Sequence, residues 1–544
     1  MNINTESRFA INPTNIEIPR SKFDRSSRHK TTFNCGELIP IYVDDALPGD
    51  TFQMDMAHVI RMSTSIHPTM DNSYFEVYAF AVPYRLVMEH FKELMGENTT
   101  SKWEQTTEYE IPQITSPANT GWAKGTIADH MGLPINVANL SVSALPFRAY
   151  ALIVNEWFRD QNLQDPAYIS LDETTQTGTN GDNYITDLQN GGKPFNVAKY
   201  HDYFTSALPE PQKGPEVLLP LGKSAPIFNA TSGDYMFSPQ WFDDSGNLIN
   251  GYNRLNSNGG QTNAGPSDDG YGARANLKLM TDLTKATSAG INELRQAIAV
   301  QHLYEADARG GTRYREIIKS HFGVTSPDAR QQVPEFLGGM KTPLNVDQVI
   351  QTSGTQTEAG TQTTPQGNVT GFTHGADASS LFVKSFTEHT IVMILACVRT
   401  LHTYQQGIER FWSRKKRLDF YWNELANIGE QAILNKEIYA QGTNEDDEAF
   451  GYQEPWAEYR YKPSIITGEL RSTYKLTLDS WHYGDDYEKL PVLSNEWIQE
   501  TKNNVDRTIA IQSSVADQFI LDMAFKCECT RPMPIYGIPG LDKL

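Results

Sequence analysis

The sequence predicts a mainly β protein, a β-sandwich or jelly roll with long loops. Aromatic residues make up 11% of the 544-residue chain, which also contains 39 Gly and 29 Pro, and this composition is typical of many strands and turns. Strand-like segments are separated by long irregular connections, and the candidate helices fall within those connections. The hydrophobic content of 39% suffices for a substantial core.

The N-terminal segment, residues 1–30, is predicted to be an extended basic arm. It contains six Lys or Arg residues against three Asp or Glu residues. The chain as a whole carries a formal net charge of -20, which argues against a nucleic-acid-binding module with a uniformly basic face. Local basic segments such as this one therefore stand out against an acidic background.

Four segments have the patterns of strands. Residues 38–43 are apolar and lead into a Leu-Pro-Gly-Asp turn. Residues 73–82 carry aromatic and β-branched side chains in both alternating sets, as expected of a strand buried on both faces. Residues 390–398 contain the longest apolar run, of a length suited to a buried strand. Residues 474–481 alternate apolar with polar side chains, which predicts a half-buried strand.

Helices are predicted in the connections, at residues 86–95, 149–159 and 283–309, from their apolar periodicity. Gly310 and Gly311 end the last of these. Two polar runs rich in Gly, Thr and Asn or Gln lack the periodicity of a helix or strand. Residues 226–275 are predicted to form a surface insertion, and residues 352–375 are predicted to form a loop.

The clearest chemical signal lies in residues 405–422, QQGIERFWSRKKRLDFYW. The candidate nucleic-acid-binding residues are five clustered cations and one neighbouring indole: Arg410, Arg414, Lys415, Lys416, Arg417 and Trp412. Cations that contact phosphates beside aromatic rings that stack on bases are typical of sequence-tolerant single-strand binding. The alternative is a basic turn whose aromatic rings pack inward and whose cations contact an acidic neighbouring subunit.

No motif indicates an enzyme, a cofactor or a metal centre. Gly222-Lys223-Ser224 ends like a phosphate-binding loop, but Val217 stands where that loop requires glycine. The four cysteines are too few for a disulfide scaffold, and the Cys-x-Cys pair at the C-terminal end is weak evidence for zinc. No apolar run is long enough for a membrane span, and the N-terminus has no secretory pattern, so we expect no membrane insertion and cytoplasmic synthesis.

Four stretches carry a resemblance to a known family. They are SKFDRSSRHKTTFNCGELIPIYVDDALPGDTF at 21–52, KYHDYFTSALPEPQKGPEVLLPLG at 199–222, GGTRYREIIKSHFGVTSPDARQQVPEFLGG at 310–339 and GYQEPWAEYRYKPSIITGELRS at 451–472. Together they resemble the major capsid proteins of the microviruses, small phages with circular single-stranded DNA, and specifically of the gokushovirus branch. The departures fall chiefly in residues 226–275 and 352–375.

This resemblance implies a structural protein with one eight-stranded antiparallel jelly-roll domain over residues 31–544. It also implies that residues 226–275 form a protrusion at each threefold axis of a T=1 icosahedral shell. The implied partners are further copies of the chain, a single-stranded DNA genome, phage scaffolding and DNA pilot proteins, and a host surface receptor. The implied location is the virion, after synthesis in the cytoplasm of a bacterial host.

A second hypothesis from the residues alone is a carbohydrate-binding or carbohydrate-active β-sandwich. In such proteins aromatic side chains stack on sugar rings, and paired acids can hydrolyse glycosidic bonds. The aromatic-rich, proline-rich stretch 451–472 would suit either hypothesis. Without metal ligands or a nucleophile, however, it is better explained by packing around the sandwich and between subunits.

Overall fold

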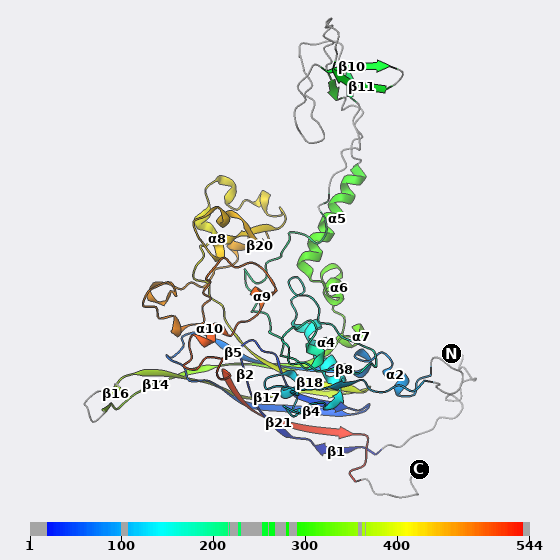
Figure 1. Cartoon of the computed structure of the whole chain (residues 1–544), viewed down its shortest axis with the longest axis vertical. Coiled ribbons are helices and arrows are strands. Elements are labelled where there is room, and N and C mark those ends of the chain that lie inside the picture. The colour runs from blue at the N-terminus through cyan, green and yellow to red at the C-terminus, as the bar shows by residue number, and fades with distance from the viewer. Residues whose placement is uncertain are drawn as a thin grey trace. The chain divides into compact units, whose positions relative to one another are not determined.

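The computed structural model (Figure 1) describes residues 19–98, 107–215, 217, 227–229, 253–258, 261–266, 279–281, 291–356, 362–364 and 366–536. The chain divides into two compact units, Met1–Lys213 with Ala306–Leu544, and Gly214–Glu305. The first unit contains the two large sheets. Of the second unit, the structure describes the strand pairs β9 (Ile227–Asn229) with β12 (Leu279–Thr281) and β10 (Asn253–Asn258) with β11 (Gln261–Pro266), and the first part of helix α5 (Ile291–Gly310).

The first sheet has six antiparallel strands. In spatial order they are β1 (Ser21–Asp24) and β2 (Ser27–Phe33), both paired with β21 (Phe519–Arg531), then β4 (Thr51–Met62), β17 (Val369–Ser385) and β14 (Asn345–Ile350). In β4 every second side chain is buried, from Phe52 to Met62. This period of two places one face of the sheet on the core and the other toward solvent.

The second sheet has four antiparallel strands, in the order β13 (Glu335–Pro343), β5 (Ser73–Pro83), β18 (Thr390–Thr400) and β3 (Ile39–Ala46). One apolar core lies between the two sheets, and alternate residues of β18 such as Val392 and Ile394 enter it. The residues between them, such as Met393 and Leu395, enter a second core on the opposite face. The four-stranded sheet is therefore the middle of three layers, with one apolar core on each of its faces.

The second core is closed by helix α4 (Leu145–Ile153), which lies above β18 in Figure 1, and by Trp122 and Phe147. Short elements complete this layer: α2 (Phe91–Leu94), α3 (Ile127–His130), β6 (Gln113–Thr115), β7 (Ser141–Ser143) and β8 (Gln176–Thr177). Helices α6 (Tyr314–Phe322) and α7 (Asp328–Gln331) lead from α5 to β13. The mainly antiparallel β-sandwich predicted from the sequence is confirmed at this level of detail.

Several predicted elements are confirmed and others need correction. The strands at 38–43, 73–82 and 390–398 are β3, β5 and β18, and the helix at 149–159 begins earlier, as α4, and continues as a π-helical turn over Val154–Phe158. The helix at 86–95 was overestimated. Only the 3-10 turn Tyr84–Leu86 and the single turn α2 form there, and Val87 and Met88 between them are buried.

The strand predicted at 474–481 is wrong. This stretch consists of turns and the 3-10 turn Asp479–Trp481, and its Leu476 is 76% exposed, so the alternation does not mark a buried face. The loop predicted at 352–375 is wrong at its end, because residues from Val369 onward belong to β17. The short strands β15 (Thr355–Gln356) and β16 (Gln362–Thr364) pair within the remaining part.

The predicted N-terminal arm and insertion are described only in part. Residues 1–18 lie outside the described residues, whereas β1 and β2 already pair with β21, so the sheet begins before residue 31. The Leu283–Arg309 helix is described from Ile291, as α5. Most of residues 226–275 lies outside the described part of the chain. Among the described helices, none is long and apolar enough to cross a membrane.

Candidate functional site

The candidate residues lie in the long segment between β18 and β21, residues 401–518. Its regular elements are short: β19 (Gln431–Leu434), α8 (Asn435–Ile438), β20 (Ala449–Gln453), α9 (Asn495–Ile498) and α10 (Asn503–Asp506), with several 3-10 turns between them. A separate apolar cluster supports this segment, with Phe204, Tyr404 and Phe450 at its centre. The basic cluster comes a few residues after Tyr404 in the chain. It occupies the 3-10 turns Arg410–Ser413 and Arg417–Asp419 and the residues between them.

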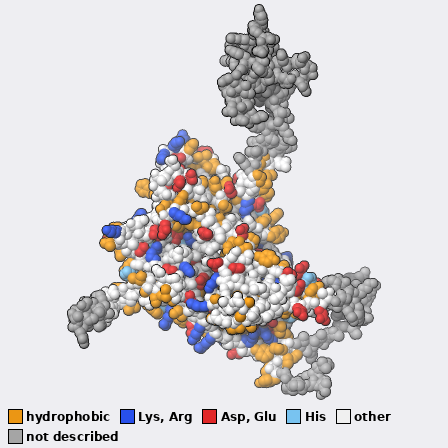
Figure 2. Space-filling view, viewed as in Figure 1, with side chains coloured by type: hydrophobic (Ala, Val, Ile, Leu, Met, Phe, Trp, Pro, Cys, Tyr) orange, Lys and Arg blue, Asp and Glu red, His pale blue; other side chains and the backbone are white. Residues whose placement is uncertain are grey.

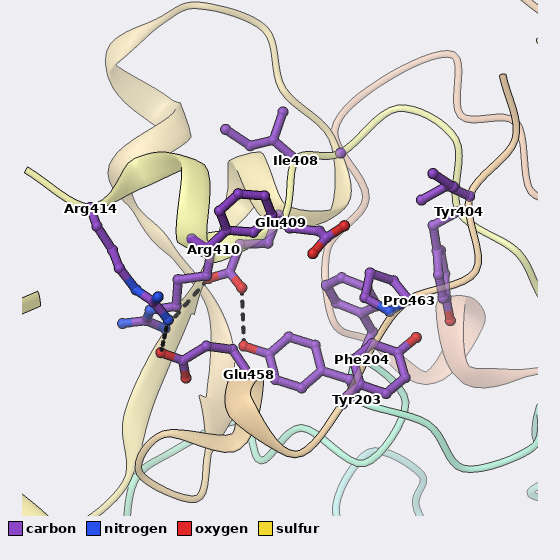
Figure 3. A pocket seen from close by; sticks show the side chains of 14 residues that line it. Tyr203, Phe204, Tyr404, Ile408, Glu409, Arg410, Arg414, Glu458 and Pro463 are labelled. Atoms are coloured by element: carbon purple, nitrogen blue, oxygen red, sulfur yellow. Dashed lines mark hydrogen bonds and ion pairs between the residues drawn. The ribbon is translucent and has the colours of Figure 1, made fainter. Parts of the chain in front are cut away.

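Two of the predicted site residues, Arg410 and Arg414, are turned inward (Figure 3). Arg410 donates to the Ala432 carbonyl oxygen at 2.7 Å and lies 3.4 Å from a Glu437 carboxylate oxygen. Arg414 lies 3.4 Å from Glu458, and its guanidinium stands 4.3 Å from the centre of the Tyr459 ring. Both charges are therefore neutralised within the chain, and both side chains hold the loop in place.

The two arginines border a small cavity that Tyr203, Phe204 and Pro463 help to line (Figure 3). Its volume is about 70 Å³, which is room for a few water molecules and far less than the several hundred Å³ of a typical small-molecule site. Gly407 passes so close to α8 that a Cβ atom would collide with the Glu437 carbonyl oxygen. The cavity is thus too small for a sugar ring or a nucleobase.

Glu437 is buried at the wall of this cavity. Its carboxylate accepts hydrogen bonds from the Tyr203 hydroxyl at 3.0 Å and from the Leu434 amide at 2.9 Å. Burial raises the pKa of Glu437, and these hydrogen bonds together with Arg410 oppose the rise. The acid serves to pair Arg410 and to cap α8.

The other predicted site residues are exposed. Three of them are the cations Lys415, Lys416 and Arg417. The turn that carries them is held by Asp419, whose carboxylate accepts hydrogen bonds from the Lys415 and Lys416 backbone amides, both at 2.7 Å. These two hydrogen bonds lower the pKa of Asp419. Within the described residues, none of the three cations forms an ion pair with a carboxylate. They are the free charges of the cluster.

Exposed aromatic rings surround these cations. Trp412 is 71% exposed, and the Arg417 guanidinium lies 4.6 Å from the centre of the Trp422 ring. The members of this basic–aromatic surface are Trp412, Lys415, Lys416, Arg417, Phe420, Tyr421 and Trp422. Each of its four rings is 39% exposed or more, and Tyr421 also packs against the buried Trp456, with 5.8 Å between the ring centres. On the face that Figure 2 shows, side chains of both charge signs are interspersed.

A buried charge network that sequence reasoning missed lies beneath the same segment. His402 Nδ1 is 3.0 Å from Asp485, and its Nε2 is 3.0 Å from Glu500. Lys199 lies 3.4 Å from the second oxygen of Asp485, and all four side chains are at most 4% exposed. The partners are far apart in sequence, so no motif spacing could have revealed them.

The charges of this network shift the titration of its members. Burial alone would lower the pKa of His402, but Asp485 and Glu500 outweigh it and raise that pKa to about 10. Burial would raise the pKa of Asp485, yet His402 and Lys199 hold it well below its ordinary value. At neutral pH the protonated His402 therefore pairs with the ionised Asp485, and the network fastens residues 401–518 to the end of β18.

No metal centre is found among the described residues, since no group of three His, Cys, Asp or Glu side chains is arranged to hold an ion. All four cysteines are free and buried. Cys527 and Cys529 are alternate core positions of β21, which explains their spacing without a metal. The acidic run at 445–448 closes its own loop, in which Asp446 accepts from the Gly442 amide at 2.7 Å.

Comparison with known proteins gives one consistent result. The family described as "Capsid protein (F protein)" matches residues 12–541. The chain is 42% identical over 549 residues to the capsid protein VP1 of Spiroplasma virus 4, covering 97% of this chain and 96% of that protein. It is 42% identical to the VP1 of Bdellovibrio phage phiMH2K, covering 98% and 97%, and 38% identical to that of Chlamydia phage 1, covering 99% and 98%.

Proposed function

This chain belongs to the capsid protein (F protein) family and is a structural major capsid protein, and we propose that its copies form a T=1 icosahedral shell around circular single-stranded DNA. The observation that carries the proposal is the match over nearly the whole chain, including both sheets and the 401–518 segment. It agrees with the gokushovirus resemblance of the four sequence stretches. Synthesis in the bacterial host cytoplasm is part of the same proposal.

We propose that the sandwich is a jelly roll. Its support is the pairing of strands from distant parts of the chain, since β21 from the C-terminal end lies between β4 and the N-terminal strands β1 and β2. Such long-range antiparallel pairing is typical of Greek-key and jelly-roll connectivity. The sheets have six and four strands, so an eight-stranded jelly roll would be extended by additional edge strands.

Within the shell, we propose that the basic–aromatic surface contacts the genome. Lys415, Lys416 and Arg417 supply free positive charge for phosphates, and Trp412 and Trp422 supply exposed faces for bases. Arg410 and Arg414 support the loop and are not phosphate ligands in this proposal, because their charges are already paired. The acidic chain as a whole makes such a local positive surface necessary on any face that meets DNA.

The test combines assembly with DNA content. Wild-type chain, expressed with its phage partners, should give closed particles under the electron microscope. Replacing Lys415, Lys416 and Arg417 together by Gln should leave particle yield unchanged and lower the retained DNA, measured by the ratio of absorbance at 260 and 280 nm. Losing three phosphate contacts should also reduce the salt-dependence slope of single-stranded DNA binding by roughly 2.

A matched control replaces three other exposed lysines of the same segment, Lys475, Lys489 and Lys502, by Gln. It changes the net charge equally and should keep wild-type DNA content. Normal DNA content in the 415–417 variant would assign those cations to a neighbouring subunit. If the wild-type chain gave no closed particles, the shell proposal itself would be wrong.

The remaining partners are also proposals. Residues 226–275 are proposed to form the threefold protrusion and to contact a host surface receptor, and scaffolding and DNA pilot proteins are proposed to act during assembly. Their support is the family relationship, together with the separation of residues 214–305 as a compact unit of their own. The carbohydrate hypothesis finds no support in the cavity beside Arg410 and Arg414, which is too small for a sugar.

A further inference from the structure

Strand β14 forms an exposed ribbon with the beginning of β17. The two strands pair from Asn345 with His374 to Ile350 with Val369. Strand β4 pairs with β17 only from His374 onward, so the preceding residues of β17 extend past the end of β4. Figure 1 shows β14 reaching away from the strands that carry the core.

The two edges of this ribbon differ. On the β17 side, Gly371 bridges to Ser65, and the Thr370 hydroxyl donates to the Ser65 carbonyl oxygen at 2.7 Å, so this edge is covered. On the β14 side, no strand among the described residues pairs with the chain. The edge of the six-stranded sheet is therefore open at β14.

The hydrogen-bond pattern shows which backbone groups are open. The Gln351 amide donates to the Asn368 carbonyl oxygen at 2.8 Å, which fixes the phase of the antiparallel ladder. Hydrogen-bonded positions alternate along such a strand. The N–H and C=O groups of Val349 and Asp347 therefore point toward β17, and those of Gln348 and Ile350 point away from it. These outward groups are donors and acceptors for another strand.

The side chains of the ribbon also lack cover. Val349 is 48% exposed, Ile350 51% and Phe372 38%. A two-stranded ribbon is at best marginally stable in water, and open edges are ordinarily protected by Lys, Pro or a bulge. The β14 sequence NVDQVI has neither Lys nor Pro, its one charged side chain, Asp347, lies 3.4 Å from His374 of β17, and its pairing with β17 has no register shift. It is built as an edge that can accept a strand.

We propose that the open edge of β14 pairs with a strand of a second copy of this chain, extending the six-stranded sheet across a subunit contact. The proposal rests on the proposed shell, because a protein that assembles with copies of itself supplies the second copy as the partner. Strand addition would satisfy the outward backbone groups of Gln348 and Ile350 and cover Val349 and Ile350 at once. It would also stabilise the ribbon, which has no third strand paired with β14 among the described residues.

The decisive variant is Gln348→Pro. Proline removes an outward N–H that no described group uses, and it leaves the ladder to β17 intact, as proline on an edge strand does. We expect a subunit with wild-type melting temperature and at least a tenfold lower particle yield. Gln348→Ala retains the N–H group and should assemble like the wild type.

Val349→Pro is the matched contrast, because the Val349 N–H points toward β17. This variant should lower the melting temperature of the subunit in addition to the particle yield. Particle formation by Gln348→Pro at the wild-type yield would overturn the proposal. If wild-type chain also failed to assemble, the failure would belong to the proposed shell instead.

A second measurement does not depend on the proline variant folding. The native cysteines are all buried, so Ile350→Cys places the one exposed thiol in the described part of the chain. A short thiol-to-amine crosslinker added to assembled particles should join residue 350 to a second copy, which appears as a band of twice the subunit mass on a denaturing gel. Assembled particles that give only crosslinks within one subunit, or crosslinks to a different protein, would contradict the proposal.

Discussion

In the sandwich, β18 is buried along almost its whole length between two apolar cores, whereas the 401–518 segment is fastened around four buried ionisable side chains. Apolar burial is indifferent to protonation, but an ion-pair network depends on the charge of each member. The difference implies that the two regions respond to different perturbations. The contribution of the apolar cores on either side of β18 should not change with pH, and the segment that carries the proposed DNA contact should be sensitive to pH.

The largest effect should come from His402→Gln. It leaves Asp485 and Glu500 buried without their shared cation, and loss of one member of a buried ion pair typically costs about 3–5 kcal/mol. Hydrogen exchange should then show lost protection in residues 401–518 and retained protection in β4 and β18. As a control, His302→Gln removes a largely exposed histidine and should change neither region. Equal loss of protection in β18 would abolish the contrast between the two regions.

Alkaline pH should reproduce this effect without a mutation. The pKa of His402 is raised to about 10 in the folded chain, so its stabilising contribution is complete below its ordinary value of about 6.5 and is lost as the pH rises through about 10. The pKa of Asp485 is lowered, so its contribution is lost only in strong acid. Protection of the 401–518 segment measured between pH 6 and 10 should fall, and His402→Gln should remove that dependence.

The smallest effect should come from Ile394→Val in β18. Removing one methylene group from the core between the sheets typically costs 0.5–1.5 kcal/mol, and here it should lower the stability of the whole sandwich. Urea unfolding should show this loss with the same magnitude at pH 7 and pH 9. A loss of stability that differed between these pH values would mean that the core between the sheets and the buried network around His402 are coupled.

The strands found from the sequence are those with continuous apolar or aromatic runs, β3, β5 and β18, because burial on both faces leaves an unambiguous pattern. The alternation of β4 and β21 was equally regular and could have been found from Phe52 to Met62 and from Phe519 to Cys529. The same alternation at 474–481 failed, since a period of two does not distinguish a buried face from an irregular exposed segment.

The sequence predicted the candidate site as one cluster of cations. It did not predict that some of these cations are paired with acids inside the chain and others are exposed. Sequence proximity placed Arg410 and Arg414 with Lys415, Lys416 and Arg417, and only the fold reveals that Glu437 and Glu458 neutralise the first two. The acids come from parts of the chain that spacing cannot connect to the cluster. The buried network around His402 was missed for the same reason.

Strand β21 has a consequence for when a subunit becomes competent to assemble. It lies between β4 and the pair β1 and β2, yet it is translated after every other strand of this sheet, so β1 and β2 have no common partner until it has been made. Pairing between distant parts of a chain is slow and leaves strand edges open in the meantime. The six-stranded sheet is therefore completed only once β21 has been made and has paired, and a subunit becomes competent to extend a shell only after that step.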